Sequence, residues 1–232
     1  MPSTLAALRR IFLAQDCVLC AAQSGDALVC GTCNAALPAL SESCPQCALP
    51  SPAGQLCGQC LREPPAFDLT LAVWRYGFPL DRLIQALKYG SRLALADWFG
   101  RALAARVADA RVDLIMPMPL HPARLRERGF NQALEIARRC APVHGGRLVA
   151  DGLLRLRDTP AQTSLPHDAR ALNMRDAFAC AMPLAGLRLA VVDDVMTTGV
   201  TLNEAAKALR SAGAAHVENW VIARAFGGPE GA

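Results

Sequence analysis

Long apolar runs are missing from this sequence. No stretch approaches the ~20 consecutive apolar residues that a membrane-spanning helix needs, although 53% of the 232 residues are hydrophobic. Near the start, Arg9 and Arg10 precede a short apolar run that Gln15 and Asp16 interrupt, whereas an export signal needs about 7–15 apolar residues after its charges. We therefore expect a cytoplasmic protein with no membrane span and with a short amphipathic helix over residues 5–12.

A strong excess of charge of one sign is also missing. The first 66 residues contain three arginines and four acidic residues, and the rest of the chain contains 21 basic and 16 acidic residues. Charged residues make up 19% of the chain, a proportion typical of globular proteins rather than disordered ones. The mildly basic body is compatible with phosphorylated ligands or nucleic acid but does not distinguish between them.

Eight of the ten cysteines form a regular series of four Cys-x-x-Cys pairs. Each such pair turns tightly and places two sulfurs where both can reach one tetrahedral Zn²⁺ at ~2.3 Å, so the series predicts two structural zinc sites. We pair neighbouring motifs, first with second and third with fourth, because the intervening segments are short. An interleaved arrangement also fits the sequence. The four pairs are Cys17/Cys20, Cys30/Cys33, Cys44/Cys47 and Cys57/Cys60.

Other uses of these cysteines fit less well. Disulfides need an oxidising compartment, and one redox Cys-x-x-Cys motif is common where four evenly spaced ones are not. The segment also has too few large apolar side chains to form a core of its own, so we expect zinc to stabilise it. The two remaining cysteines, Cys140 and Cys180, lie among apolar residues and are predicted to be small core side chains.

Consecutive prolines at 64 and 65 break regular structure and mark a predicted domain boundary. We assign residues 1–65 to the N-terminal helix and double zinc ribbon, and residues 66–232 to a second domain. Its strand and helix patterns alternate, which predicts an α/β domain with a parallel sheet flanked by helices. The predicted strands cover residues 69–74, 112–116, 189–192 and 217–223, and the predicted helices cover residues 80–87, 95–103, 130–140 and 202–209.

The segment over residues 189–201 is the most informative in the chain. A buried strand delivers two adjacent carboxylates at its end, where ligands bind in open α/β sheets. Hydroxyls, a glycine and the start of a helix follow, a combination that favours binding of a phosphate monoester. We expect the carboxylates to be exposed, to accept hydrogen bonds from sugar hydroxyls and to help hold Mg²⁺. The predicted site consists of Asp193, Asp194, Thr197, Thr198, Gly199, Val200 and Thr201.

This segment resembles the motif of type I phosphoribosyltransferases that binds 5-phosphoribosyl-1-pyrophosphate (PRPP): an apolar run, two acids and Thr-Thr-Gly-x-Thr. The resemblance implies that residues 197–201 hold the 5-phosphate and that Asp193 and Asp194 bind the ribose hydroxyls at the catalytic centre. It also implies a type I phosphoribosyltransferase-like fold. A strand end and a helix cap alone would need one such residue, and not two carboxylates, three threonines and a glycine.

The similarity extends to the ComF (competence protein F) branch of these proteins and to its relatives, the gluconate-associated GntX proteins. Residues 117–119, Arg124 and the run 128–132 resemble the pyrophosphate-loop region of that branch, and residues 155–178 resemble its mobile active-site loop. Residues 121–175 contain ten arginines and five acidic residues, and a pyrophosphate leaving group needs positive charge. We expect Arg124 and Arg128 to bind PRPP and Arg157 to act in catalysis, and we give Lys88 less weight.

The ComF resemblance implies transfer of a phosphoribosyl group to an unknown acceptor, for which a nucleobase is one candidate, with release of pyrophosphate. It also implies a role in DNA uptake or in the use of DNA-derived nucleotides, beside other DNA-uptake proteins. Two alternatives stay open, because a fold does not settle a function. One is a regulator that senses PRPP or nucleotides without turnover. The other is a nucleic-acid handling module in which the zinc ribbons or the arginine-rich surface contact DNA, with a weak, non-specific contact to single-stranded DNA.

Overall fold

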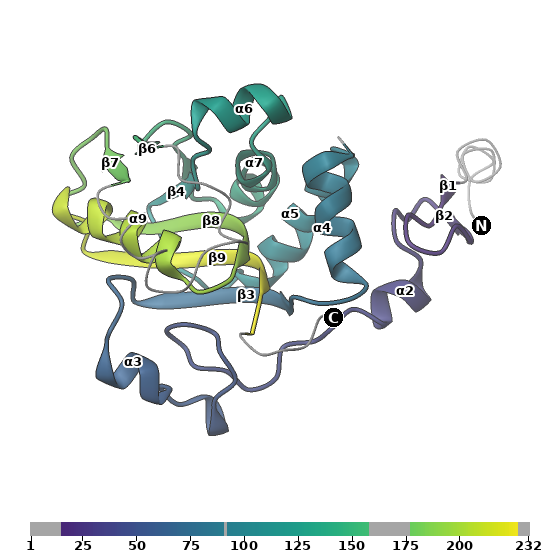
Figure 1. Ribbon diagram of the computed structural model, residues 1–232, viewed down its shortest axis with the longest axis horizontal. Coiled ribbons are helices and arrows are strands. Elements are labelled where there is room, and N and C mark those ends of the chain that lie inside the picture. Colours follow the sequence, from purple (N-terminus) through teal and green to yellow (C-terminus); the bar gives the residue numbers. More distant parts are fainter. Residues whose placement is uncertain (1–14, 91, 158–176, 227–232) are drawn as a thin grey trace.

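The computed structural model describes residues 15–90, 92–157 and 177–226. At its centre lies a five-stranded sheet in the order β3-β9-β8-β4-β5, in which all neighbouring strands are parallel (Figure 1). The predicted parallel α/β sheet is therefore confirmed. Its strands are β3 (Leu69–Arg75), β9 (His216–Arg224), β8 (Arg188–Met196), β4 (Leu114–Pro117) and β5 (Arg147–Leu148).

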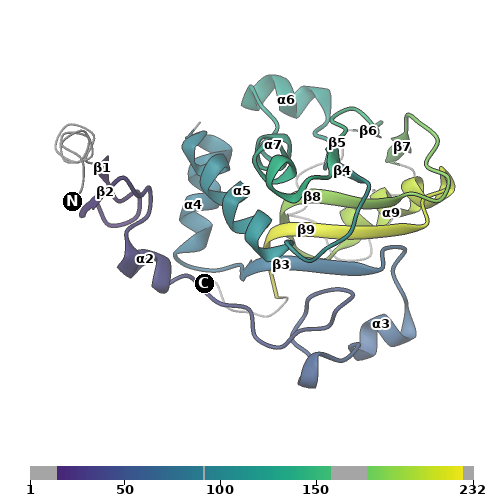
Figure 2. The same cartoon turned by 180° about the vertical axis from the view of Figure 1, so that it is seen from behind.

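Helices cover both faces of this sheet, as Figures 1 and 2 show. The alternation of side chains along β8 supplies one core on each face. Ala190 and Val192 belong to the first core, and Leu189 and Val191 belong to the second. The first core contains α4 (Leu80–Tyr89), α5 (Ala94–Arg106) and most of the buried residues of α7 (Gln132–His144), and the second contains α9 (Val200–Ser211).

Several short elements were not predicted from the sequence. They are too short for a hydrophobic period to distinguish them from loops. Two of them, β6 and β7, pair antiparallel outside the main sheet. These elements are β5, α6 (Pro122–Arg128), β6 (Leu153–Arg155) and β7 (Phe178–Cys180).

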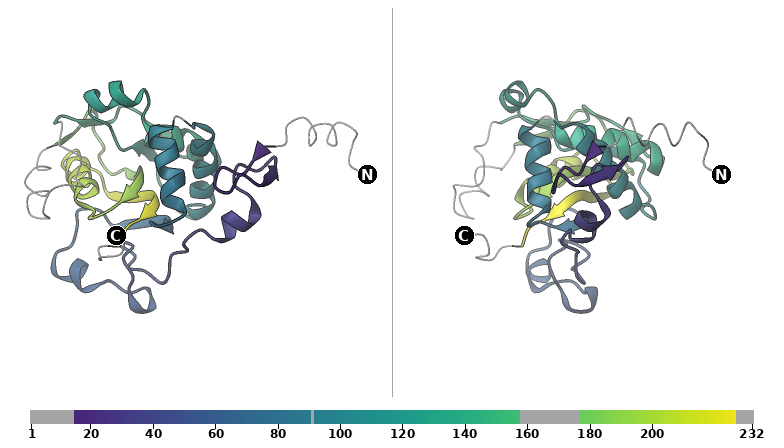
Figure 3. Two further views of the ribbon diagram at one scale, coloured as in Figure 1. Left: turned by 45° about the vertical axis from the view of Figure 1, so that its right-hand side comes forward. Right: turned by 90° about the vertical axis from the view of Figure 1, so that its right-hand side faces the viewer.

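The first cysteine-rich unit lies beside α4 and α5 and the second lies along β3, and each belongs to a different core (Figure 3). Cys17, Val29 and Leu37 join the core of α4 and α5, whereas Cys44 and Cys47 join the core of α9. We call residues 15–35 the first ribbon and residues 44–62 the second ribbon. They contain β1 (Gln15–Asp16), β2 (Gln23–Gly25) and α2 (Gly31–Ala35) in the first, and η1 (Pro52–Gly54) and α3 (Gly58–Arg62) in the second.

Predictions outside the sites had mixed outcomes. Cys140 is fully buried, as expected, whereas Cys180 is half-buried and its sulfur donates to the carbonyl of Met182 at 3.1 Å. Among the described residues, no helix combines the length and apolar character that crossing a membrane requires. The predicted helix over residues 5–12 and most of the predicted mobile loop, residues 158–176, lie outside the described residues.

Candidate functional site

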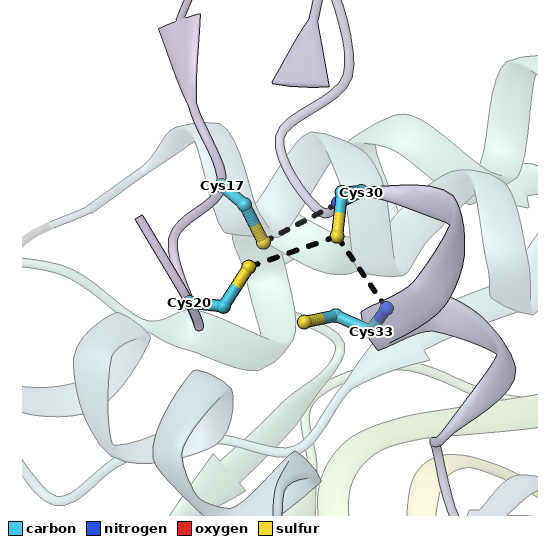
Figure 4. Close-up of side chains that lie close together, drawn as sticks. All are labelled: Cys17, Cys20, Cys30 and Cys33. Carbon is cyan, nitrogen blue, oxygen red and sulfur yellow. Dashed lines mark hydrogen bonds between the residues drawn. The ribbon is translucent and has the colours of Figure 1, made fainter. Parts of the chain in front are cut away.

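Each ribbon brings four cysteine sulfurs together, all within 4.8 Å of one another. Neighbouring Cys-x-x-Cys pairs supply each group, so the sequential pairing holds and the interleaved one does not. Figure 4 shows the first group pointing toward a common centre. The groups are Cys17, Cys20, Cys30 and Cys33 in the first ribbon, and Cys44, Cys47, Cys57 and Cys60 in the second.

The donor chemistry of these groups fits zinc. In the first ribbon, the Cys17 sulfur accepts a hydrogen bond from the Cys30 N–H at 3.3 Å. Burial alone would raise the pKa of Cys17, but backbone N–H groups, that of Cys30 foremost, outweigh it and lower the pKa to about 6. Four closely spaced sulfurs, at least one of them inclined to ionise, are the donor set of a structural zinc site.

A cleft of about 220 Å³ opens at the carboxyl end of β8. It is formed where β8, α6, the end of α4 and β6 meet, the edge at which parallel α/β sheets bind ligands. Among the described residues that line it, four side chains are cationic at neutral pH and one, Asp193, is a carboxylate. The cationic lining residues are Lys88, Arg124, Arg128 and Arg155. This distribution of charge suits a polyanionic ligand.

The segment Thr197–Thr201, here called the phosphate loop, carries the chain from β8 into α9. Gly199 adopts a left-handed conformation with φ +83°, and a Cβ there would lie 2.7 Å from Cε of Met196. Only glycine suits both conditions. The turn places the N-terminus of the 12-residue helix α9 beside the cleft, which Thr197, Gly199 and Thr201 line. Hydroxyls and helix N–H groups at such a position favour an anion.

The two adjacent carboxylates have different surroundings. β8 continues through both to Met196, so alternation directs them to opposite faces of the sheet. Asp193 lines the cleft, and its Oδ1 accepts the backbone N–H of Asp194 at 2.8 Å. Asp194 is only 5% exposed and lies 2.9 Å from Nζ of Lys88. The expectation that both carboxylates are exposed is therefore wrong: Asp194 is buried and Asp193 is half-buried, because β8 extends beyond its apolar run.

Burial and the charge of Asp194 raise the pKa of Asp193 to about 7. Burial of Lys88 disfavours its charged form, but the Asp194 carboxylate outweighs that effect and raises the pKa of Lys88. The result is a firm Lys88–Asp194 ion pair beside an acid, Asp193, that exchanges its proton near neutral pH.

Replacing Asp193 by asparagine should stabilise the ligand-free protein at alkaline pH. The folded protein holds a proton on Asp193 up to about pH 7, whereas the unfolded chain releases it near pH 3.8. The ionisation penalty therefore grows from about pH 4 to pH 7 and persists above it. We expect Asp193→Asn to raise the free energy of unfolding by on the order of 1–4 kcal/mol at pH 8.

Denaturant unfolding at pH 5, 6, 7 and 8 checks this expectation. The exposed Asp151→Asn is the matched control, with no pH-dependent gain expected. If Asp193→Asn raised the free energy of unfolding by the same amount at every pH, the folded protein would not raise the pKa of Asp193.

Side chains around α6 brace the cationic wall of the cleft. Arg128 donates from Nη1 to Oε1 of Gln132 at 2.8 Å, and its guanidinium lies 5.3 Å from the ring centre of Tyr89. Asn131 caps α7 by accepting the N–H of Ala133 at 3.0 Å and donates to the carbonyl of Met118 at 3.0 Å. The Gln132 and Tyr89 contacts hold Arg128 in the ligand-free protein, and the Asn131 contacts join the start of α7 to Met118.

Not every predicted residue lines the cleft. Arg157 is exposed just beyond β6, and Arg155 is the arginine of that segment that reaches the cleft. Thr198 and Val200 line a separate hollow of about 260 Å³ between the phosphate loop and the second ribbon. The sequence analysis missed Tyr89 and gave Lys88 little weight, because neither belongs to a local motif. It placed Gln132 and Arg155 in segments that resemble ComF loops but gave neither residue a role, because their position at the cleft depends on tertiary contacts.

Known proteins match this chain both in its cysteine-rich segment and over most of its length. Residues 8–61 match the double zinc ribbon domain. Over 171 residues the chain is 35% identical to the DNA utilization protein YhgH of Salmonella typhi, and the match covers 71% of this chain and 75% of that protein. Over 175 residues it is 31% identical to competence protein F of Haemophilus influenzae, covering 71% and 76%.

Solved structures are more distant. The chain is similar to a purine phosphoribosyltransferase from Pyrococcus horikoshii, with 16% identity over 56% of this chain and 82% of that one, at a TM-score of 0.35. It is also similar to an allosteric regulatory enzyme of purine biosynthesis, with 21% identity and a TM-score of 0.36. That match covers 54% of this chain and 25% of the enzyme.

Proposed function

Because this chain belongs to the ComF family, together with competence protein F and the DNA utilization protein YhgH, we propose that it binds PRPP and transfers its phosphoribosyl group. The observation that carries the proposal is the cleft at the end of β8. There an anion-binding loop, a carboxylate and four cationic side chains converge on one ligand-sized space. PRPP needs those three environments for its 5-phosphate, its ribose hydroxyls and its pyrophosphate.

The residues of the cleft divide these roles. The phosphate loop donates hydroxyl and backbone hydrogen bonds to the 5-phosphate. Asp193 accepts hydrogen bonds from the ribose hydroxyls, while Asp194 keeps Lys88 in place through their 2.9 Å ion pair. The arginines on the opposite wall, Arg124 and Arg128, face the pyrophosphate and stabilise its charge as it leaves.

Magnesium fits this proposal because carboxylate and phosphate oxygens are the ligands it prefers. Asp193 is the lining carboxylate that would help to hold it, and the ion would supply further charge compensation to pyrophosphate. Neither Asp193 nor the cationic residues need to attack the ribose, because the acceptor is the nucleophile. The catalytic role proposed for Arg157 rests on the resemblance to the ComF active-site loop, because Arg157 is exposed and does not line the cleft.

The proposed cellular role is the handling of incoming or scavenged DNA in the cytoplasm. The names of the two relatives support it. A weak, non-specific contact between the basic body and single-stranded DNA would assist that role, and its affinity would fall with salt. The alternative supported by the same cleft is a PRPP-sensing regulator that binds without turnover.

Calorimetry of PRPP with Mg²⁺, followed by a pyrophosphate-release assay against a panel of nucleobases, tests the proposal. We expect PRPP to bind only with Mg²⁺ and one class of base to release pyrophosphate. Binding without release by any base would favour the regulator, and the absence of binding would refute both.

A strain carrying the Asp193→Asn/Asp194→Asn variant should lose DNA uptake or growth on DNA as a nutrient. The reason is that both proposed roles need PRPP at the cleft. The measurement compares transformation frequency and growth with those of a strain carrying the wild-type protein at equal abundance. Wild-type behaviour in both assays would separate the cleft from DNA handling.

A further inference from the structure

Arg224, the last residue of β9, lies between the second ribbon and the phosphate loop and is only 2% exposed. Its Nε donates to the carbonyl of Cys47 at 2.6 Å, and its Nη1 donates to the carbonyl of Met196 at 3.1 Å. Nη1 also donates to the carbonyls of Thr197 and Ala225. The Arg224 side chain thus joins a zinc-binding turn to Met196, which precedes the phosphate loop, and to Thr197, the first residue of that loop.

A buried guanidinium is costly unless hydrogen bonds and opposite charge compensate it. Within residues 15–90, 92–157 and 177–226, no carboxylate forms an ion pair with Arg224. Cys47 and Cys60 of the second ribbon line the same hollow as Arg224. A zinc ion held by four thiolates carries net negative charge, so the metal-loaded second ribbon supplies the missing compensation.

The turn that Arg224 contacts is firmly held to the sheet. The N–H of Thr70 donates to the carbonyl of Pro45 at 2.9 Å, and its hydroxyl donates to the carbonyl of Gln46 at 2.6 Å. Nε2 of Gln46 donates to the carbonyl of Phe67 at 3.1 Å. When the sulfurs of the second ribbon hold zinc, these contacts therefore fix the position of the Cys47 carbonyl relative to β3 and β9.

The contact also sets the direction of N–H groups in the phosphate loop. In a planar trans peptide, the carbonyl and the following N–H point in opposite directions. Arg224 holds the carbonyl of Thr197 and, together with the Ala225 N–H at 2.9 Å, that of Met196. These contacts turn the N–H groups of Thr197 and Thr198 away from the ribbon. The strength of an anion site built from backbone N–H groups depends on that orientation.

We propose that Arg224 is a positioning residue that ties the phosphate loop to the second ribbon, so that metal in the second ribbon controls phosphate binding at the loop. The proposal rests on the proposed binding of PRPP. Metal in the first ribbon has no such effect, because that ribbon joins the core on the other face of the sheet.

Arg224→Lys removes the forked donor while keeping the charge, and Arg210→Lys is its matched control. Arg210 also donates to several carbonyls, those of Ala66, Ala214 and Ala215, but lies at the far end of α9 from the loop. We expect Arg224→Lys to retain both zinc ions and to weaken PRPP binding about tenfold, with the control within about twofold of wild type. Amide hydrogen exchange over residues 196–201 should also accelerate about tenfold in Arg224→Lys.

A second pair of variants breaks the link from the ribbon side and leaves Arg224 in place. Cys57→Ser removes one ligand of the second ribbon, and Cys30→Ser removes one ligand of the first. We expect only Cys57→Ser to accelerate exchange over residues 196–201 and to weaken PRPP binding.

Hydrogen exchange tests the link between the second ribbon and the phosphate loop in the absence of PRPP. If the wild-type protein does not bind PRPP, the proposed function fails, and faster loop exchange in Arg224→Lys and Cys57→Ser still supports the positioning role. Unchanged loop exchange and unchanged PRPP affinity in both variants would overturn it. Equal effects of Cys30→Ser and Cys57→Ser would overturn the claim that the second ribbon alone controls the loop.

Discussion

Strong chelation should release two zinc ions per chain and unfold residues 17–60. The ribbons contain few large apolar side chains, and structural zinc supplies on the order of 10 kcal/mol or more to such sites. The central strands β4 and β8 should keep much of their amide protection. The body should still lose stability, since Cys44, Cys47 and Cys60 belong to the same core as α9. Metal release measured with a chromogenic chelator, beside hydrogen exchange by segment, gives both results.

Single cysteine variants supply the controls for this experiment. Cys30→Ser and Cys57→Ser should each lower the zinc content from two ions to one, because each belongs to a different group of four. Cys140→Ala should keep both ions, since Cys140 lies in the core between α5 and α7 and outside both groups. Purified protein that holds no zinc and has its cysteines in disulfides would contradict the assignment.

The Asp193→Asn/Asp194→Asn variant should lose at least about 100-fold in Mg²⁺-dependent PRPP affinity, the combined effect of two charged contacts at roughly tenfold or more each. Asp193 loses its charge toward the ribose and Mg²⁺, and Lys88 loses the carboxylate that holds it 2.9 Å away. Calorimetry of PRPP with Mg²⁺ measures the loss directly.

Stability must be followed in parallel, because Asp194 is buried. Asp194→Asn alone leaves the Lys88 ammonium without its partner and should cost about 1–3 kcal/mol. Asp193→Asn alone should not destabilise the fold, so any loss of PRPP affinity in that variant reports on the site. Undiminished PRPP affinity in the double variant, with Asp151→Asn as the control, would remove Asp193 from the ribose site.

The sequence predicted those features that depend on local patterns. Four evenly spaced Cys-x-x-Cys pairs predicted two four-sulfur sites and favoured the pairing of neighbours, because the intervening segments are short; the interleaved pairing was excluded by the structure. The apolar run from Leu189 to Val192 predicted a central strand, since only a strand covered on both faces is apolar throughout. The glycine and threonines after it predicted the loop into α9.

Features that depend on tertiary contacts could not be predicted in this way. Lys88 closes the α4 end of the cleft and belongs to no recognisable motif. Arg155 closes the β6 end, and its segment resembles the ComF active-site loop, but that resemblance does not show which of its arginines reaches the cleft. The burial of Asp194 follows from β8 continuing past its apolar residues, which hydrophobicity alone does not show. The proposed role of Arg224 depends on its contact with Cys47, which lies 177 residues away in the sequence.

A crystal structure of the protein with PRPP and Mg²⁺ tests the central claim most directly. We expect the 5-phosphate within hydrogen-bond distance of the phosphate loop, the ribose hydroxyls on Asp193, and the pyrophosphate facing Arg124 and Arg128. Density for PRPP at another place, or an empty cleft at a concentration where calorimetry shows saturation, would contradict it.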